Sequence, residues 1–206
     1  MSLKIQLEKV GLRLGRKWLF RNLSIELESG QSWAILGPNG AGKTSFLSLV
    51  AGYLSPTEGV VRRLWQGKPM KERFFLTRLF WQSPATQPPP DFTVADIVGD
   101  IYRQKLISQP IKSFYEEWNL PPTLRWYELS SGMKQRLLLG LALRGEEGLI
   151  LLDEPTTFLD PYYQSYFSEC LKKCVGNPNF LVICATNHPQ EALLFSHSIN
   201  LPNHAM

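Results

Sequence analysis

The chain is predicted to adopt an α/β fold with a mixed sheet core, antiparallel strands near its N-terminus and an inserted helical subdomain. Three observations support this. Short apolar segments alternate with helical segments, a glycine-rich loop joins a strand to a helix, and a proline-rich stretch followed by helices separates two buried strands. A length of 206 residues fits one domain with a substantial core.

The first predicted elements are two strands. Apolar residues occupy every second position over residues 3–7 and again over 23–27, which is typical of half-buried strands, and a turn follows at 28–30. A short apolar strand at 33–36 then leads into the glycine-rich segment 37–42. We expect a helix from about Lys43 to Gly52.

The segment 83–145 is predicted to be helical. Extended segments are expected at Val60–Trp65 and Leu76–Trp81. Residues 83–90 contain four prolines, which favours a linker. Thr93 and Asp96 resemble a capping box that opens a helix to about Lys105, and a further helix is expected at 111–118.

The remaining elements restore the α/β pattern. Leu149–Leu152 is a continuous apolar run, typical of a parallel strand that is covered on both faces. Asp160 and Pro161 fit the N-cap and first position of a helix, and Phe180–Ala185 is another buried strand. We therefore predict one domain over 1–206, with a core formed by 1–82 and 146–206 and a helical subdomain formed by 83–145.

Composition limits the classes of function. Hydrophobic residues make up 44% of the chain and charged residues 19%, an ordinary globular balance. The net charge of +4 is mild and the Lys and Arg residues are scattered, so we expect no direct nucleic-acid partner. The three cysteines, Cys170, Cys174 and Cys184, lack the paired short spacings of zinc motifs and are interpreted as reduced structural thiols.

The sequence shows neither a secretory signal nor a membrane span. Residues 1–15 lack the apolar core of a signal peptide, and no apolar run reaches the roughly 18 residues that suggest a transmembrane helix. We expect a cytoplasmic protein, and any membrane role then requires another polypeptide to supply the span.

The glycine-rich segment matches the pattern GxxxxGK[ST] of phosphate-binding loops. Glycines let the backbone N–H groups wrap around phosphate oxygens, and the following helix adds its positive end. Lys43 would reach the β- and γ-phosphates, and the Thr44 hydroxyl would ligate Mg²⁺. The sequence therefore predicts binding of ATP and Mg²⁺ by Gly37, Pro38, Asn39, Gly40, Ala41, Gly42, Lys43, Thr44 and Ser45.

Two acidic residues follow the buried strand at 149–152. The strand delivers Asp153 and Glu154 to the carboxyl edge of the sheet, where open α/β folds bind their ligands. We expect Asp153 to hold Mg²⁺, directly or through water, and Glu154 to polarise the attacking water. An acidic pair at the end of a strand is common. We assign this pair a function because a phosphate loop lies upstream of it.

The segment Leu129–Arg136 resembles the signature sequence LSGGQ of ATP-binding-cassette (ABC) proteins. It lies about twenty residues before Asp153 and at the start of a predicted helix. Ser131 stands in place of the first glycine and Met133 in place of the glutamine. Ser130 and Gly132 are retained, and the resemblance implies that they contact the γ-phosphate.

The resemblance covers essentially the whole chain and implies further roles. Gln82 is similar to the Q-loop glutamine that senses Mg²⁺, Asp160 ends a segment similar to the D-loop, and His188 is similar to the switch histidine at the γ-phosphate. Leu14 stands where the family places an aromatic residue on the adenine. Trp18 and Phe20 are the alternatives, and either could instead pack in the core.

The resemblance implies an ATPase that works as a pair of cassettes. Each ATP would lie between the phosphate loop of one chain and the Ser130–Gly132 segment of the other, and the second cassette could be identical or different. The leading interpretation is a transporter subunit, peripheral at the inner face of the cell membrane, that couples hydrolysis to a separate permease.

Three alternatives remain. One is a soluble ABC ATPase that acts on ribosomes or DNA, although no heptads lie between Lys43 and Asp153. Another is a haem-exporter-type ATPase of cytochrome c maturation, to which the short Arg21–Ser24 segment is similar. The third is a nucleotide-gated binding module with little turnover, which the presence of Glu154 and His188 disfavours.

Overall fold

A computed structural model describes residues 2–83 and 87–201. Its strands are β1 (Leu3–Leu14), β2 (Lys17–Glu28), β3 (Ser32–Leu36), β4 (Glu58–Trp65), β5 (Lys68–Pro69), β6 (Leu79–Gln82), β7 (Gly148–Asp153), β8 (Phe180–Ala185) and β9 (His197–Asn200). Its helices are α1 (Lys43–Ala51), α2 (Glu72–Leu76), α3 (Val94–Lys105), α4 (Ile111–Glu117), α5 (Ser131–Ala142), α6 (Pro161–Lys172) and α7 (Pro189–Ala192), with a 3-10 turn η1 at Trp126–Glu128. The predicted α/β class is confirmed.

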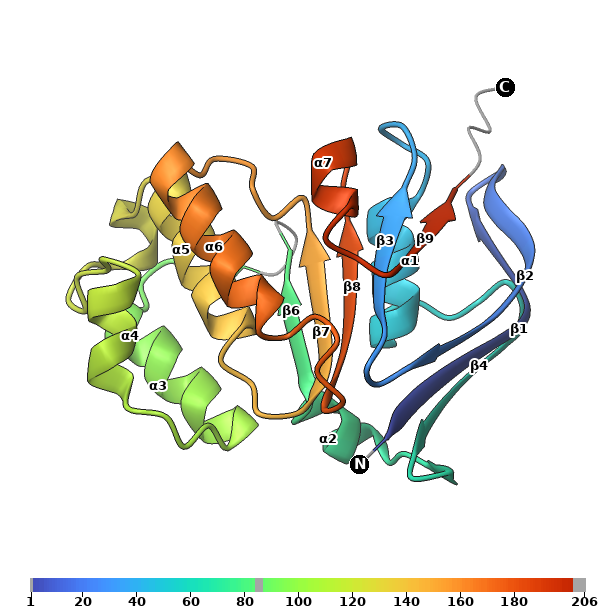
Figure 1. The fold of residues 1–206 in the computed structure, drawn as a ribbon, viewed down its shortest axis with the longest axis horizontal. Coiled ribbons are helices and arrows are strands. Elements are labelled where there is room, and N and C mark those ends of the chain that lie inside the picture. Colours follow the sequence, from blue (N-terminus) through green and yellow to red (C-terminus); the bar gives the residue numbers. More distant parts are fainter. Residues whose placement is uncertain (1, 84–86, 202–206) are drawn as a thin grey trace.

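The strands form two sheets (Figure 1). One is antiparallel, with the order β2-β1-β4-β5. The other is parallel, with the order β6-β7-β8-β3-β9. The predicted mixture of parallel and antiparallel strands is thus divided between two sheets, and the antiparallel one contains the two N-terminal strands.

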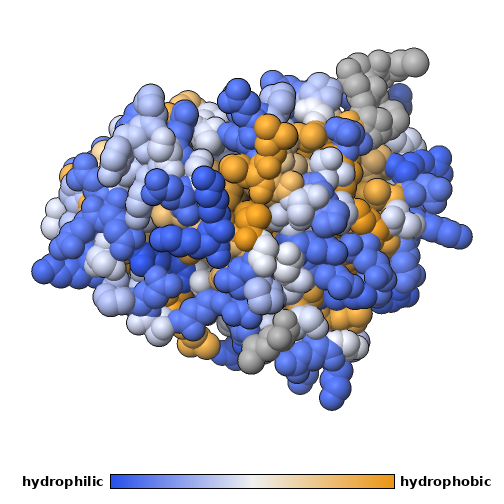
Figure 2. All heavy atoms as spheres, in the orientation of Figure 1, coloured by the Kyte–Doolittle hydropathy of each residue, from blue (hydrophilic) through white to orange (hydrophobic). Residues whose placement is uncertain are grey.

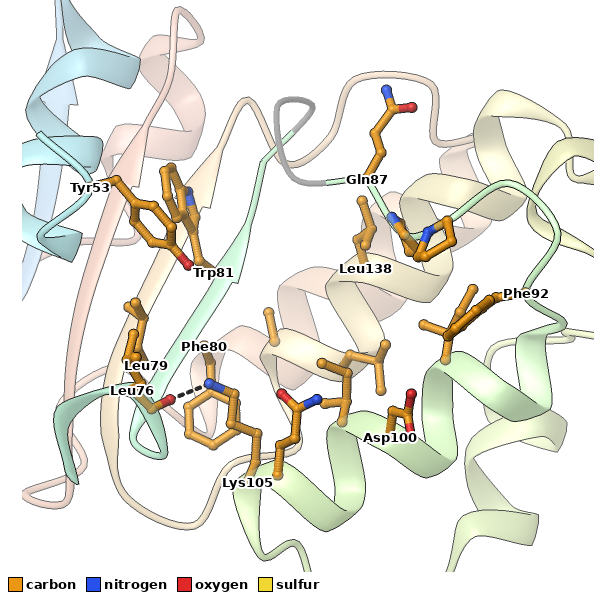
Figure 3. A pocket seen from close by; sticks show the side chains of 17 residues that line it. Tyr53, Leu76, Leu79, Phe80, Trp81, Gln87, Phe92, Asp100, Lys105 and Leu138 are labelled. Carbon is orange, nitrogen blue, oxygen red and sulfur yellow. Dashed lines mark hydrogen bonds between the residues drawn. The ribbon is translucent and has the colours of Figure 1, made fainter. Parts of the chain in front are cut away.

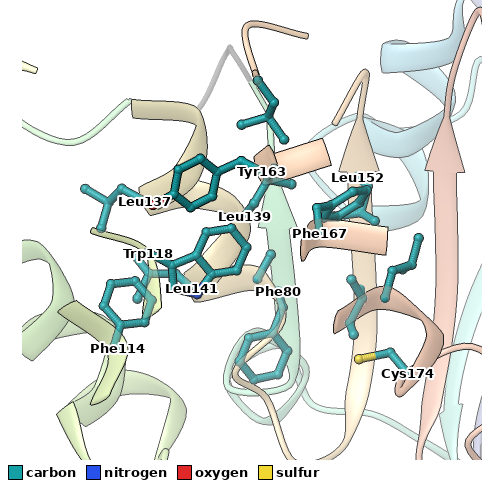
Figure 4. Packing of buried hydrophobic residues seen from close by; sticks show 14 of the residues in the cluster. Phe80, Phe114, Trp118, Leu137, Leu139, Leu141, Leu152, Tyr163, Phe167 and Cys174 are labelled. Atoms are coloured by element: carbon teal, nitrogen blue, oxygen red, sulfur yellow. The ribbon is translucent and has the colours of Figure 1, made fainter. Parts of the chain in front are cut away.

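The parallel sheet is buried on both faces, which explains its continuous apolar runs. Along β7, Ile150 and Leu152 pack in one core cluster, and Leu149 and Leu151 pack in the other. The first cluster also contains residues of α3, α4, α5 and α6, and Figure 4 shows its aromatic side chains among the helices and against the sheet. The second contains α1 and the inner face of the antiparallel sheet. Because successive strand residues point to opposite faces, β7 anchors both layers.

The segment between β6 and β7 contains α3, α4, η1 and α5, so the structure is helical where helices were predicted. The capping box is present, since Thr93 Oγ1 accepts from Asp96 N at 3.1 Å and Asp96 accepts in return from Thr93 N at 3.0 Å. Residues 84–86 of the expected linker lie outside the described residues.

One local prediction was wrong. Leu76 ends α2 instead of starting a strand, because the short helix carries Phe75 into the core and leaves Leu76 exposed. The strand begins at Leu79.

One glycine fixes how β4 approaches β1. Gly59 has a φ of +78°, and an added Cβ would lie 2.3 Å from the carbonyl oxygen of Glu8. Any other side chain would therefore strain the backbone and push these two strands apart.

Apolar surface gathers over the middle of the face in Figure 2, and hydrophilic side chains cover both flanks. Leu193, directly after α7, is 84% exposed.

In the described part of the chain, no helix has both the length and the apolar character that crossing a bilayer requires.

Candidate functional site

Three parallel strands end at one edge of the sheet and bring the predicted site residues together. The glycine-rich loop follows β3, Asp153 and Glu154 lie at the end of β7, and Thr186 and Asn187 follow β8. Because β7, β8 and β3 are neighbours in the sheet, side chains more than a hundred residues apart in sequence meet there.

The loop between β3 and α1 has the backbone of a phosphate-binding loop. Gly40 has a φ of +79° and Gly42 a φ of +96°, values that favour glycine. An added Cβ at Gly42 would lie 3.0 Å from the Leu19 side chain, so the loop packs tightly on β2. The exposed residues Pro38, Asn39 and Gly40 leave the loop accessible from outside. A curled loop at a helix N-terminus is suited to bind an anion.

Lys43 is the cation at the centre of the site, and its side chain is only 7% exposed. Its Nζ donates to the carbonyl oxygen of Gly37 at 2.9 Å and to Oδ1 of Asn187, and it lies 3.4 Å from Oε1 of Glu154. An ammonium group has three donors. Two of these donors have hydrogen-bond partners, on the loops that follow β3 and β8, and the Glu154 carboxylate after β7 forms an ion pair with the ammonium.

Asp153 and Thr44 form the predicted Mg²⁺ pair. The Thr44 hydroxyl donates to Asp153 Oδ2 at 2.9 Å, and Ser83 Oγ lies 3.3 Å from the same oxygen. Burial raises the pKa of Asp153, although the hydrogen bonds from Thr44 and Ser83 act in the opposite direction. A buried carboxylate whose charge is incompletely compensated, beside a hydroxyl oxygen, fits a hard divalent cation such as Mg²⁺.

Glu154 is held in an unusual backbone conformation. Its φ of +49° lies in the left-handed region, which a residue with a side chain adopts only where surrounding contacts impose it. Glu154 N donates to the carbonyl oxygen of Ala185 at 2.9 Å, and Asn187 N donates to Glu154 Oε2 at 3.3 Å. The carboxylate is therefore aimed at the phosphate loop and is 25% exposed.

Gln82 lies beside Asp153, and its side chain is fully buried. Its Oε1 accepts from Asp153 N at 3.0 Å, and its Nε2 donates to Gln135 Oε1 at 3.4 Å. Gln135 in turn donates to the carbonyl oxygen of Pro155 at 2.6 Å. In this arrangement Gln82 positions the Asp153 backbone through one of the two lone pairs of its side-chain oxygen. The sequence analysis missed Gln135 and Ser83, because each is an ordinary polar residue next to another polar residue.

The signature segment forms the N-terminus of α5. Ser130 is exposed and is the N-cap, and its Oγ accepts from Met133 N at 3.2 Å. At Gly132, an added Cβ would lie 3.0 Å from the carbonyl oxygen of Phe158, so this position packs closely on the loop before α6. Asp160 caps α6 by accepting from Tyr163 N at 2.9 Å.

The structure brings Asn187, the residue before His188, to the phosphate loop. Asn187 Oδ1 accepts from Lys43, and its Nδ2 donates to Asn39 Oδ1 at 2.6 Å. His188 is exposed and is the N-cap residue of α7. The sequence analysis missed Asn187 because a histidine, with its known chemistry, stands directly after it.

The three candidates for the nucleotide base differ in exposure. Leu14 is 49% exposed at the end of β1. Phe20 is buried and packs against Phe46, with ring centroids 6.0 Å apart, so it belongs to the core. The guanidinium of Arg21 lies 4.4 Å from the ring centroid of Trp18, so Trp18 already has a cation on one face.

A second feature is an apolar groove of about 490 Å³ between the sheet and the helical segment (Figure 3). Tyr53 and Trp81 lie at one end, with ring centroids 5.1 Å apart, and Leu138 and Phe92 line the other side. Trp81 Nε1 is buried and has no hydrogen-bond partner among the described residues. Lys105 donates to the Leu76 carbonyl oxygen, and burial lowers its pKa to about 8. Trp81 directly precedes Gln82 on β6.

Known proteins resemble this chain in sequence. The family model for ABC transporters matches residues 20–157. The Nod factor export ATP-binding protein I of Paraburkholderia xenovorans is 29% identical over 203 residues, which is 95% of this chain and 66% of the relative. The corresponding protein of Burkholderia orbicola is 31% identical over 196 residues, 91% of this chain and 64% of the relative. The chain thus spans slightly less than two thirds of these relatives.

Solved structures share the fold. A putative ABC transporter ATP-binding protein from Pyrococcus furiosus superposes with a TM-score of 0.76 at 19% identity, over 96% of this chain and 97% of that one. A bacterial ABC transporter cassette solved as a dimer has a TM-score of 0.79 at 20% identity, over 96% and 94%. Together with the family match over residues 20–157, these likenesses show that the chain belongs to the ABC transporter family and is a nucleotide-binding domain of that family.

Proposed function

We propose that the chain binds Mg-ATP and hydrolyses it to ADP and phosphate. The observation that carries this proposal is the convergence of a phosphate loop, the Lys43 ammonium, the Thr44–Asp153 pair and the Glu154 carboxylate at one sheet edge. Hydrolysis of ATP is phosphoryl transfer to water, in which the protein contributes positioning and stabilisation of charge. These groups supply both.

Each group has a separate role in the proposal. Gly37–Ser45 and Lys43 bind the phosphates, and Thr44 and Asp153 hold Mg²⁺, which offsets the charge that develops on the phosphate oxygens. Glu154 orients the attacking water and accepts its proton. Gln82 holds the Asp153 backbone in place through one lone pair of its side-chain oxygen, and the second lone pair of that oxygen can ligate the metal.

The second half of the site is supplied by another cassette. Ser130 and Gly132 lie at the N-terminus of α5, and Asp160 caps α6 at the end of the loop that packs on Gly132. We favour a homodimer, with a heterodimer as the alternative. In the same proposal, residues 83–145 form a signature subdomain attached to the nucleotide-binding core of 1–82 and 146–206.

The apolar groove is the proposed docking site for a membrane permease at the inner face of the cell membrane. An apolar helix end would cover Tyr53, Trp81 and Leu138. These relatives are named as export ATP-binding proteins, and we propose export as the direction of transport.

ATP binding is tested with Lys43→Ala. Removal of the central cation should abolish tight binding of Mg-ATP in calorimetry, whereas Lys68→Ala, at an exposed lysine on β5, should leave it unchanged. Tight binding by Lys43→Ala would rule out the assignment of the phosphate loop.

Permease docking is tested by a charge placed in the groove. Leu76 lines it and is 39% exposed, and Ile111 on α4 is 38% exposed and does not line it. In cells that contain the natural partner, Leu76→Asp should move the protein from the membrane fraction to the soluble fraction, while Ile111→Asp should not. Equal membrane fractions for both variants would reject the groove as the docking site.

A further inference from the structure

We propose that Tyr127 supplies an aromatic face for the base of the ATP that is bound by a second copy of this chain. The inference rests on the proposed pairing of two identical cassettes and deepens it. It assigns to the chain opposite a contact with the base that the residues around Leu14 do not provide.

Within one chain, the three candidates for contact with the base are poorly suited to stack on it. Leu14 is 49% exposed but has no ring, and Phe20 is buried. Trp18 has a ring, but the guanidinium of Arg21 on β2 lies 4.4 Å from its centroid and that of Arg13 on β1 lies 5.5 Å from it. The ring of Trp18 is therefore already engaged by cations of its own sheet.

Tyr127 is an exposed aromatic residue just before the signature segment. It lies in η1 (Trp126–Glu128), three residues before Ser130, and is 56% exposed. Its neighbour Trp126 is only 4% exposed, so the turn buries one ring and leaves the next one outside. An exposed ring of this size gains from burial against another flat apolar surface, and a purine base is such a surface.

The turn that presents Tyr127 is held firmly by the backbone. Tyr127 N donates to the carbonyl oxygen of Pro90 at 3.2 Å, and Trp126 N donates to that of Phe92 at 2.9 Å. The Lys134 ammonium of α5 lies 5.2 Å from the centroid of the Trp126 ring. The turn is thus fixed both to the segment 90–92 and to the signature helix. A side chain on a fixed backbone loses less conformational freedom when it binds a ligand.

Phe158 is a second exposed ring near the signature segment, but its position differs. It is 68% exposed, and it lies in the loop that runs from Glu154 and packs on Gly132. In the proposed pair, the catalytic edge and the signature segment of one chain serve two different ATP molecules. The loop that joins them therefore lies between the two nucleotides, where Phe158 would meet the partner chain.

Tyr127 lies outside that loop, on the turn attached to the segment 90–92. Three residues of extended chain span at most about 10 Å, so Tyr127 and Ser130 can contact the same nucleotide. With Ser130 at the γ-phosphate, a ring at Tyr127 is placed toward the base end of that ATP. We therefore assign the base to Tyr127 and not to Phe158.

The assignment has a distinctive consequence, because the ring acts only across the closed pair. It should strengthen closure of two chains on ATP and leave the affinity of a single chain for nucleotide unchanged. Stacking on an aromatic face also tolerates any base, since each base has a π-face. Tyr127 would therefore accept adenine and guanine alike.

The first test measures closure in the Glu154→Gln background at saturating ATP, by sedimentation. Tyr127→Ala should raise the dissociation constant of the dimer about tenfold, toward the lower end of what loss of base–aromatic stacking costs. Its affinity for ADP in calorimetry should match the parent. Tyr127→Phe keeps the ring and should restore the dimer. Tyr162→Ala, at a tyrosine that is 70% exposed on α6, is the matched control and should leave the dimer within a few-fold of the parent.

The second test separates stacking on the base from a contact between proteins. The probe is 1,N6-ethenoadenosine triphosphate, whose emission is quenched when its base stacks on an aromatic ring. Emission per bound nucleotide should fall as Glu154→Gln dimerises. It should not fall in Tyr127→Ala at protein concentrations that make this variant dimeric. Equal quenching in the two dimers would overturn the inference, and so would the same quenching in the Ser130→Arg monomer, because the ring would then belong to the chain that binds the nucleotide.

The outcomes distinguish this inference from the proposed function. If Glu154→Gln dimerises on ATP and Tyr127→Ala dimerises equally well, the inference fails and the pair of cassettes stands. The inference also fails if Tyr127→Phe does not restore the dimer, or if Tyr162→Ala weakens it as much as Tyr127→Ala. If Glu154→Gln stays monomeric in ATP, self-pairing fails together with this inference, while binding of Mg-ATP is judged separately by Lys43→Ala.

Discussion

The phosphate-loop edge and the N-terminus of α5 differ in how their polar groups are satisfied. At the loop edge, Lys43 has partners on three separate segments of the same chain, and Asp153 accepts from Thr44 and Ser83. At α5, Ser130 is exposed, and its Oγ accepts from Met133 N of its own first turn. The first region is assembled by the fold of one chain, whereas the second presents a helix N-terminus outward.

This difference separates binding from catalysis in the proposed mechanism. The loop edge contains what is needed to hold Mg-ATP in a single chain. The outward-facing helix N-terminus is suited to bind an anion, and in the proposed mechanism a second chain carries that anion. Affinity should therefore depend mainly on the first region, and closure of two chains on the second.

The largest expected effect comes from Glu154→Gln, which should slow hydrolysis at the loop edge without weakening the binding of nucleotide. The amide keeps the shape of the side chain but cannot accept the proton of water. Hydrolysis should fall by about 10²–10⁴-fold, as for loss of a general base, while the affinity for Mg-ATP stays within a few-fold of the parent. Phosphate release and calorimetry measure the two quantities. Retention of full turnover would remove Glu154 from the mechanism.

Ser130→Arg tests the outward-facing region. In the Glu154→Gln background, saturating ATP should convert monomer to dimer in size-exclusion chromatography, because the trapped nucleotide bridges two chains. Adding Ser130→Arg fills the helix N-terminus and should restore the monomer, with ATP affinity largely kept. Ser108→Arg, an exposed serine after α3, should leave the dimer intact. A Glu154→Gln protein that stays monomeric in ATP would contradict self-pairing and favour a different second cassette.

Gln135 connects the two regions, because it lies on α5 and donates to the Pro155 carbonyl oxygen beside Glu154. Gln135→Leu leaves that oxygen and Gln82 Nε2 buried without this partner. We expect a loss of about 1–3 kcal/mol in the free energy of unfolding, the usual cost of an unsatisfied buried polar group. Urea unfolding measures it, with Gln104→Leu on the exposed side of α3 as the control. Equal stability of the two variants would show that the link carries little energy.

Sequence patterns predicted the parts of the molecule in which local chemistry and fold agree. The capping box at Thr93, the strand at 149–152 and the helix that starts at Lys43 were confirmed, because each depends on residues close in the chain. The short helix α2 was missed, since no side chain caps it and its existence depends on burying Phe75.

The candidate site was less completely predictable, because part of it depends on contacts between residues far apart in the chain. The roles given to Lys43 and Asp153 follow from motifs. Asn187 could be found only when β8 placed it beside β3, 144 positions from Lys43. For Gln82 the motif suggests a metal ligand, and the fold adds a hydrogen bond from Asp153 N to the same oxygen, which the motif does not reveal. Contacts between distant segments decide such roles.

The smallest expected effect concerns recognition of the nucleotide base, for which the loop edge offers few suitable side chains. Leu14 is exposed but has no ring, Phe20 is in the core, and Trp18 lies against Arg21. Selectivity between adenine and guanine requires polar groups that read the base edge, and an apolar side chain does not supply them. We therefore expect ATP and GTP to differ by less than about a hundredfold in turnover, which corresponds to 2.7 kcal/mol.

Leu14→Phe sharpens the test, because an aromatic face should strengthen the binding of both nucleotides by about 0.5–1.5 kcal/mol without separating their affinities. Leu14→Ala is the control for lost apolar contact and should weaken both slightly. A preference for ATP above a hundredfold in the parent would show that another residue reads the base, and gain of selectivity in Leu14→Phe would place that residue next to position 14.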